Sequence, residues 1–330
     1  MSTQQTAATS QPADEPTSEV IRTEGLTKVY PEGGEDEEDL VAVDHLDLTV
    51  CRGEIFGLLG PNGAGKTTTV GMLTTRVIPT EGTAWVDGVD VVADPTKVKR
   101  VIGVVHQLNT LDRSLTVYEN LYFHGRYFGM NNKEARAAAD EALQKFRLSG
   151  RGRADVRALS GGMARRLMVA RAFLHHPAVL FLDEPTAGLD PQSRLALWDI
   201  LGELRAQGET IMLTTHYMEE ADHFCDRVAI IDHGQILALD TPARLKRKAG
   251  RTEGTVDQAK ARLAQLRAMA RTGQGPGEDS QPSDPGEVEE AALMQFLEDA
   301  EEAGGNIDEL PTDVTLESVF INLTGRDLRE

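Results

Sequence analysis

The sequence of 330 residues has few cysteines, few aromatic residues and no apolar run long enough to span a bilayer. Its two cysteines, Cys51 and Cys225, are too few for a disulfide framework and lack metal-ligand spacing. We therefore expect both cysteines to be free thiols that pack as small buried hydrophobic side chains, in a protein of a reducing compartment. The longest apolar candidate, residues 178–182, has the length of a core strand. Residues 1–18 contain no apolar segment, which argues against a secretory signal.

Basic residues are fewer than acidic ones, 34 Lys and Arg against 53 Asp and Glu, so the formal net charge is −19. This imbalance is local. Residues 1–39 contain ten acids and two bases, and residues 272–303 contain ten acids and no Lys or Arg. The remaining chain is close to neutral, so we expect ordinary electrostatics over the folded part. Nucleic acid is not an expected partner.

The chain does contain one phosphate-binding motif, since residues 60–67 match G-x-x-x-x-G-K-[ST]. Its three glycines allow a tight turn in which backbone N–H groups approach phosphate oxygens. Lys66 would place a positive charge on the β- and γ-phosphates, and the Thr67 hydroxyl would supply an oxygen ligand to Mg²⁺. We expect a buried strand at 54–59 before the loop and a helix at 67–76 after it, whose N-terminus faces the phosphates.

Strands alternate with helices along most of the chain, which predicts an α/β fold with a largely parallel central sheet. Besides the strand before the loop, we expect strands at 20–30, 41–50, 83–86, 101–105, 178–184, 210–215, 228–232 and 235–238. Helical patterns cover 116–148, 164–174 and 191–207. The first two strands should form a hairpin, whose loop at 32–39 holds six acids in eight residues. Arg165, Arg166 and Arg171 are expected on the polar side of their helix.

Polar side chains follow three of the expected apolar strands. The strand at 178–184 ends in two carboxylates, Asp183 and Glu184, which is unusual for a purely structural strand. Another strand runs into Gln107 and a third ends at His216. Because parallel sheets bind ligands at the carboxyl ends of their strands, the carboxylates predict a functional site there. A lone histidine at a strand end is more often structural.

The character of the chain changes after residue 240. A basic cluster at 244–251 is followed by an expected helix at 256–269, a flexible linker at about 272–287 and an acidic helix at 291–303. Thr315 can cap a final helix that carries one apolar stripe. The stripe consists of Leu316, Val319, Phe320 and Leu323. It must be buried on this chain or on a partner.

With the phosphate loop, four further segments make the sequence resemble the ATP-binding subunit of an ATP-binding cassette (ABC) transporter. These segments are Leu159–Met163, Leu180–Thr186, Gly188–Asp190 and Thr214–His216. The resemblance covers about residues 20–240 and implies an ABC ATPase domain of the P-loop NTPase class. Such a domain has a RecA-like parallel-sheet core, an antiparallel β subdomain and a helical subdomain, here at about 108–175. A disordered tail at 1–19 and a C-terminal regulatory or accessory region at 241–330, forming a small tail domain, would flank it.

The resemblance implies ATP and Mg²⁺ as cofactors and roles for individual residues. Glu184 would be the general base that polarises the attacking water, and His216 would contact the γ-phosphate. Gln107 would touch Mg²⁺ and the attacking water, and Asp183 would hold Mg²⁺ together with Thr67. The implied nucleotide-binding residues are Tyr30 (stacking on adenine), Gly60, Asn62, Gly63, Ala64, Gly65, Lys66, Thr67, Thr68, Ser160, Gly161, Gly162 and Asp190.

Members of this family work as head-to-tail pairs. Ser160, Gly161 and Gly162 of one copy would complete the site built on Lys66 of the other, and Asp190 would act across the interface. Completion of the site by dimerisation would then switch hydrolysis on. The implied partners are a second copy of the chain and a separate ABC-2-type membrane permease, at the cytoplasmic face of the cell membrane.

Two features narrow the resemblance to one group of exporters. Met163 stands where many cassettes have Gln, and the ending 316–326 looks like that of daunorubicin-resistance and nodulation-factor exporter ATPases. This group implies ATP-driven efflux of a hydrophobic drug, antibiotic or lipid-like compound, and hence multidrug or antibiotic resistance. An importer ATPase shares all the catalytic motifs and stays an alternative.

A soluble cassette that works on ribosomes or DNA is less favoured. Translation-associated members carry two cassettes, whereas this chain has one phosphate loop. DNA-repair members insert long coiled coils between the loop and the Asp-Glu strand, and no heptad run lies between Lys66 and Asp183. The choice between export and import rests on family analogy alone.

Overall fold

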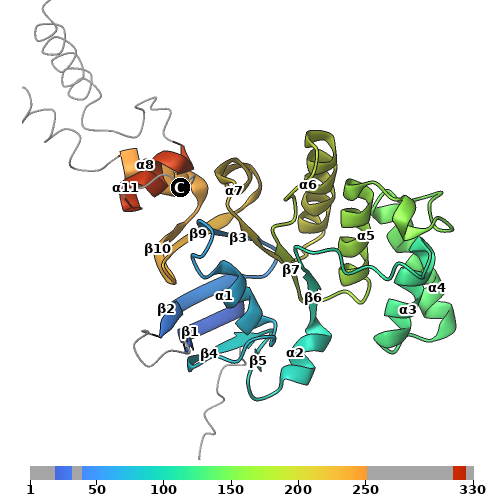
Figure 1. The fold of residues 1–330 in the computed structure, drawn as a ribbon, viewed down its shortest axis with the longest axis horizontal. Helices are drawn as coiled ribbons and strands as arrows, with labels where there is room; N and C mark the ends of the chain where they lie inside the picture. Colours follow the sequence, from blue (N-terminus) through green and yellow to red (C-terminus); the bar gives the residue numbers. More distant parts are fainter. Residues whose placement is uncertain (1–18, 32–38, 251–314, 325–330) are drawn as a thin grey trace, which may run out of the picture.

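A six-stranded, mostly parallel sheet lies at the centre of the structure, which is a computed structural model (Figure 1). Its strands, in the order in which they pair, are β10 (Gln235–Asp240), β9 (Arg227–Asp232), β3 (Ile55–Leu59), β8 (Ile211–Thr215), β7 (Val179–Asp183) and β6 (Ile102–Val105). β3 pairs in parallel with both β8 and β9, and β10 returns antiparallel along β9. The predicted α/β fold with a largely parallel sheet is confirmed.

The structure describes residues 19–31, 39–250 and 315–324. Several predicted segments lie outside the described residues. They are residues 1–18 of the tail, residues 32–38 of the acidic loop, the helix at 256–269, the linker at 272–287 and the acidic helix at 291–303. No helix within the described ranges has the length and apolar character needed to cross a membrane.

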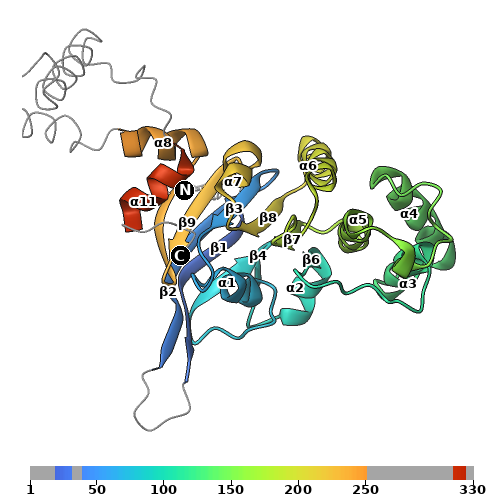
Figure 2. The ribbon, with the colours of Figure 1, turned by 45° about the horizontal axis from the view of Figure 1, so that its top comes forward.

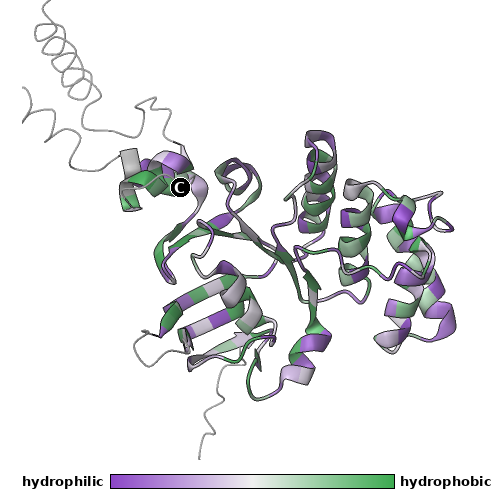
Figure 3. Ribbon diagram, viewed as in Figure 1, coloured by the Kyte–Doolittle hydropathy of each residue, from purple (hydrophilic) through white to green (hydrophobic). Residues whose placement is uncertain are grey.

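A second, four-stranded sheet is entirely antiparallel and has the order β2-β1-β4-β5. It consists of β1 (Glu19–Tyr30), β2 (Leu40–Cys51), β4 (Glu81–Val86) and β5 (Val89–Asp90). The hairpin expected ahead of the phosphate loop is therefore correct. β1 begins at Glu19, a residue expected in the tail. Hydrophobic and hydrophilic residues alternate along these strands, as a sheet with one buried face requires (Figure 3).

Helices cover the parallel sheet, which separates the core into two clusters, one on each face. α1 (Lys66–Leu73) packs between the two sheets, where Val70 and Leu73 join side chains such as Phe56 of β3. α2 (Pro95–Val101) joins the same cluster through Val98, whereas the other face of β3, including Ile55, lies in a second cluster with the core residues of the other helices. The other helices with their bounds are α3 (Val117–Tyr127), α4 (Asn132–Lys145), η1 (Val156–Ala158), α5 (Gly161–Phe173), α6 (Pro191–Ala206), α7 (Met218–Phe224), α8 (Pro242–Gly250) and α11 (Leu316–Thr324).

The predicted helix ends differ from the observed ones for local reasons. α1 ends at Leu73 rather than Arg76, because the chain turns through Thr75 at a positive φ of 60°. The helical pattern at 116–148 is two helices, α3 and α4, and each begins with a capping box. The sequence did not predict α2. It ends at Val101, a residue expected in the next strand.

The two ends of the molecule are formed by different helices. α3 and α4 lie at one end, whereas α8 and α11 lie together at the opposite end (Figures 1 and 2). Thr315 caps α11, as predicted, and accepts a hydrogen bond from the Ser318 amide at 3.2 Å. Leu316, Val319 and Phe320 are buried in the core cluster, and α11 contacts α7 and α8. Leu323, the fourth residue of the stripe, is 44% exposed, so the described chain does not bury it and its burial on a partner stays a prediction.

Replacing Phe320 by Ala is expected to loosen α11 from α8. Phe320 is 2% exposed, and truncation of a buried Phe costs about 3–5 kcal/mol, because apolar contacts are lost and a cavity remains. Hydrogen–deuterium exchange at residues 315–324 should therefore accelerate. Ile321→Ala is the matched control, since Ile321 is 40% exposed and its truncation leaves little cavity. Equal protection of α11 in both variants would contradict the packing described here.

Candidate functional site

The phosphate-binding loop connects β3 to α1, as the sequence predicts, and its glycines have no substitute. Gly63 and Gly65 have positive φ values of 84° and 98°, a region that residues with a Cβ rarely adopt. A Cβ at Gly65 would lie 2.3 Å from the Ala42 carbonyl oxygen, and one at Gly60 would lie 2.2 Å from the Ile231 carbonyl oxygen. Close approach of neighbouring backbone therefore sets the shape of the loop.

The remaining residues of the loop differ in how far they are exposed. Asn62 and Thr67 are exposed, Thr68 is half-buried and Ala64 is buried. Exposed hydroxyl, amide and N–H groups at the start of α1 match what an anion needs at a helix N-terminus. Ala64 instead packs into the core beneath the loop.

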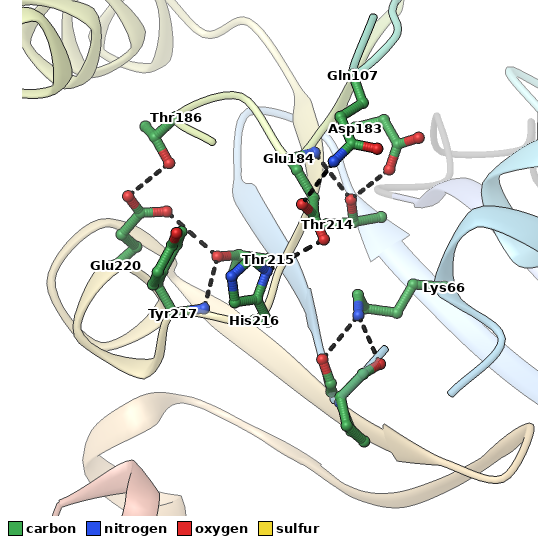
Figure 4. Close-up of polar contacts among 12 residues, drawn as sticks. Lys66, Gln107, Asp183, Glu184, Thr186, Thr214, Thr215, His216, Tyr217 and Glu220 are labelled. Atoms are coloured by element: carbon green, nitrogen blue, oxygen red, sulfur yellow. Dashed lines mark hydrogen bonds and ion pairs between the residues drawn. The ribbon is translucent and has the colours of Figure 1, made fainter. Parts of the chain in front are cut away.

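Lys66 is held within this loop. Its Nζ donates to the carbonyl oxygens of Gly60 at 2.7 Å and Pro61 at 2.8 Å (Figure 4). Burial lowers the pKa of the Lys66 ammonium, while the negative charges of Glu184 and Asp183 act in the opposite direction. Lys66 thus places a buried positive charge, bound to two backbone carbonyl groups, within the electrostatic influence of Glu184 and Asp183.

The carboxylates lie at the end of β7, the strand beside β8: Asp183 is its last residue and Glu184 follows it. Thr214 of β8 is paired with Asp183 and donates from Oγ1 to Asp183 Oδ1 at 2.7 Å. The same hydroxyl accepts a hydrogen bond from the Glu184 amide at 3.0 Å. Glu184 has a φ of 44°, a strained value for a residue with a side chain. The backbone turn at Glu184 separates the two acids.

Gln107 and His216 both contact the Glu184 side chain (Figure 4). Gln107 Nε2 donates to Glu184 Oε2 at 3.2 Å, and His216 Nδ1 lies 3.1 Å from Glu184 Oε1. Gln107 comes after β6, Glu184 after β7 and His216 after β8. Because these three strands are neighbours in the sheet, their ends bring the three residues together. This arrangement can hold one small molecule, such as water, against a carboxylate between a hydrogen-bond donor and an imidazole.

A buried glutamate that the sequence analysis missed connects Thr215, the residue before His216, with the segment after Glu184. Glu220 of α7 is 4% exposed and accepts from Thr186 Oγ1 at 2.6 Å and from Thr215 Oγ1 at 3.2 Å. Arg194 of α6 completes the cluster, with Nε 3.6 Å from Glu220 Oε1. The sequence signal was weak, since Glu220 is the second of two adjacent acids in a helix of about two turns. A cavity of about 290 Å³ beside these residues is also lined by Glu317 of α11.

The expectation that Arg165 lies on the polar side of its helix was wrong. Arg165 is 7% exposed, and its guanidinium donates to backbone carbonyl groups next to Gln107 and Glu184. Burial lowers the pKa of Arg165 to about 10. Helical spacing gave one signal of this burial, because Met168 and Ala172, three and seven residues later, are also buried, but it gave no signal of the backbone carbonyl groups that Arg165 binds.

The Leu-Ser-Gly-Gly segment and Asp190 lie at the N-termini of two neighbouring helices. Ser160 caps α5 by accepting from the Met163 amide at 3.3 Å, and Asp190 caps α6 by accepting from the Ser193 amide at 2.9 Å. Hydrogen bonds from Ser193 lower the pKa of Asp190. A Cβ at Gly162 would lie 2.2 Å from Ser193 Oγ, so the two helix starts pack closely.

The structure does not bring all the predicted nucleotide contacts together in one chain. Ser160, Gly161 and Asp190 are exposed, and within the described residues no hydrogen bond joins Ser160 to the loop around Lys66. Tyr30, at the end of β1, is 36% exposed, with Lys28 Nζ 5.0 Å from its ring centroid. The roles of these residues therefore stay predictions.

The oxygen donors beside the loop are suited to Mg²⁺. Thr67 offers a hydroxyl, Asp183 a carboxylate and Gln107 a side-chain amide, all hard ligands. In the part of the chain that the structure describes, no cluster of three or more His, Cys, Asp or Glu side chains could hold a metal ion. A single carboxylate with two neutral oxygen donors beside a phosphate site matches the way proteins bind Mg²⁺ with nucleotides, in which phosphates and waters complete the coordination.

Comparisons with known proteins agree with this geometry. Residues 43–187 match the ABC transporter family. Nod factor export ATP-binding protein I of Ralstonia nicotianae is 39% identical over 323 residues, covering 94% of this chain and 95% of the relative. Daunorubicin/doxorubicin resistance ATP-binding protein DrrA of Streptomyces peucetius is 46% identical over 230 residues, covering 70% and 68%. A dimeric ATP-binding cassette in a post-hydrolysis state, bound to ADP and Pi, aligns with a TM-score of 0.61 and 28% identity, covering 67% of this chain and 98% of that one.

Proposed function

The chain belongs to the ABC transporter family as the ATP-binding and ATP-hydrolysing subunit of an exporter, and we propose that the exported cargo is a hydrophobic drug, antibiotic or lipid-like compound. The names of two relatives support this proposal, since one exports Nod factor and the other confers resistance to daunorubicin and doxorubicin. Each relative is named as the ATP-binding protein of its system.

The observation that carries the function is the convergence of Gln107 and His216 on Glu184 beside the phosphate loop. In our proposal Glu184 takes a proton from the attacking water, while Gln107 and His216 orient that water. Lys66 and the N–H groups of the loop neutralise charge on the phosphates. Thr67, Asp183 and Gln107 would hold Mg²⁺, which supplies further charge neutralisation when bound. Tyr30 would stack on adenine.

The active site in this proposal is composite. Ser160, Gly161 and Gly162 of one copy would contact the nucleotide held by Lys66 of a second copy, and Asp190 would lie at the same interface. Two observations support it: Ser160, Gly161 and Asp190 are exposed at helix N-termini, and a dimeric cassette has the same fold. Dimerisation would thus complete the site for hydrolysis.

The proposal includes a membrane partner and a division of the chain. The cassette would comprise residues 20–240 with its helical subdomain at about 108–175, and 241–330 would be an accessory region. A separate ABC-2-type permease would carry the cargo, with this subunit at the cytoplasmic face of the cell membrane. The position of α11 against α7, the helix that follows His216, supports a regulatory role for the accessory region.

Mixing two inactive variants tests the composite site. Lys66→Ala removes the phosphate contact of one copy, and Gly161→Asp places a charge where the second copy would contact nucleotide. A Cβ at Gly161 meets no heavy atom within 4 Å, so this change should leave the fold intact. Each variant alone should lack ATPase activity. Their mixture should regain activity, because a mixed dimer pairs the intact loop of one copy with the intact Gly161 of the other.

Two results would contradict the composite site. Full activity of Gly161→Asp alone would show that each copy hydrolyses ATP without its neighbour. A mixture as inactive as its components, although the mixed dimer forms, would show that Lys66 and Gly161 do not serve a shared site in the manner proposed. Unchanged chain mixed with each variant is the matched control for dilution.

A further inference from the structure

Arg165 makes an unusually complete set of hydrogen bonds for a buried arginine. Its Nε donates to the Pro185 carbonyl at 2.7 Å, and Nη2 donates to the carbonyls of Asp183 at 2.8 Å and Glu184 at 2.7 Å. Nη1 donates to the His106 carbonyl at 2.6 Å and, more weakly, to that of Gln107 at 3.4 Å. All five acceptors belong to the backbone.

These carbonyl groups lie where two strands of the parallel sheet have just ended. β6 ends at Val105 and β7 ends at Asp183, so the residues that follow lack the regular ladder of hydrogen bonds. A buried carbonyl without a donor is costly, and a guanidinium with five N–H groups is suited to satisfying several at once. Arg165 therefore determines the course of the backbone at both strand ends.

The same hydrogen bonds stabilise the strained conformation of Glu184. Its φ of 44° lies in a region that residues with a side chain rarely adopt, and it persists only where neighbouring groups enforce it. Arg165 binds the carbonyls before, at and after Glu184, while the Thr214 hydroxyl binds its amide. The direction of the Glu184 side chain follows from this backbone turn.

Arg165 also links the strand ends to the start of α5. It lies on the second turn of the helix that Ser160 caps. α5 packs directly on β6, because a Cβ at Gly103 would lie 2.3 Å from the Ala172 carbonyl. A displacement at Ser160 or Gly161 would therefore be transmitted through Arg165 to the backbone of Gln107 and Glu184.

We infer that Arg165 is a positioning residue for ATP hydrolysis: it sets the relative placement of Gln107 and Glu184 and couples both to the helix that begins at Ser160. This inference rests on the proposed roles of Gln107 and Glu184. Lysine cannot replace arginine here, because an ammonium presents three donors from one point and cannot reach carbonyls on two strands.

Arg165→Lys in the full chain tests the inference, with Arg166→Lys as the matched control. Arg166 is adjacent, and its Nη1 donates to the carbonyls of Phe146 and Arg147 in the helical part, away from Glu184. We expect kcat of Arg165→Lys to fall about 10²-fold, the effect of an error of about 1 Å in the placement of reacting groups. Binding of a fluorescent non-hydrolysable ATP analogue should stay close to that of the unchanged chain, as should kcat of Arg166→Lys.

Expressing kcat per nucleotide-binding molecule separates positioning from folding, and Arg165→Gln provides a second, neutral variant. A loss of analogue binding that parallels the loss of kcat in both variants would overturn the inference, as would an unchanged kcat per binding molecule. Failure of the proposed function would look different, since the unchanged chain and Arg166→Lys would then also fail to hydrolyse ATP.

Discussion

Replacing Glu184 by Gln is expected to lower kcat for ATP hydrolysis by about 10²–10⁴-fold while ATP binding is retained. The amide keeps the size of the side chain and can still lie between Gln107 and His216. It cannot accept a proton from water, however, and nucleotide binding depends on other residues, above all Lys66. ATP-bound dimers should therefore accumulate. Steady-state hydrolysis and size-exclusion chromatography with ATP measure both effects.

Glu219→Gln is the matched control for this experiment. Glu219 is exposed, lies in the first turn of α7 and undergoes the same chemical change. Its activity and its monomer–dimer equilibrium should equal those of the unchanged chain. A Glu184→Gln protein that stayed monomeric and still hydrolysed ATP would show that Glu184 is not the base and that the dimer mechanism is misassigned.

Lys66→Ala is expected to abolish hydrolysis by a different route, through loss of ATP binding. Lys66 is 6% exposed, so its proposed ion pair with the ATP phosphates would be buried. Removal of one partner from a buried charge pair costs about 2–5 kcal/mol, which corresponds to a loss of about 30-fold or more in affinity for ATP. The change also removes the donor that the Gly60 and Pro61 carbonyls share. Titration with a fluorescent ATP analogue measures the affinity.

Lys133→Ala is the matched control for Lys66→Ala, and Glu184→Gln distinguishes loss of ATP binding from loss of hydrolysis alone. Lys133→Ala removes the same charge from an exposed site on α4 and should bind the analogue normally. Unlike Glu184→Gln, the Lys66→Ala protein should form no additional dimer when ATP is added. Native affinity in Lys66→Ala would show that the loop does not hold the phosphates in the proposed manner.

The site was predictable from the sequence where its signals are local. The phosphate loop lies within ten consecutive residues, and its backbone demands glycine wherever φ is positive. Asp183 ends β7, and Glu184 and His216 directly follow β7 and β8, so their position at the carboxyl edge of the sheet follows from strand direction alone.

Other parts of the site could not be predicted because their partners are distant in the chain. Arg165 was expected in solvent, yet its acceptors lie 18–20 and 58–59 residues away. Glu220 meets Thr186 across 34 residues. A polar residue in a helix is read by default as exposed, and only packing reveals a set of backbone carbonyls that it must satisfy.

The sequence by itself thus determined the fold class, the phosphate loop and the strand ends that carry the acids, because these depend on local backbone conformation and on the period of apolar residues. The tertiary structure alone decided which polar groups are buried together. It placed Arg165 behind the backbone of Gln107 and Glu184, Glu220 against Thr215, and the apolar stripe of α11 on α7 and α8 with Leu323 exposed. The physical reason is that a buried polar or apolar group is stable only with partners, and those partners come from segments that meet in space rather than in sequence.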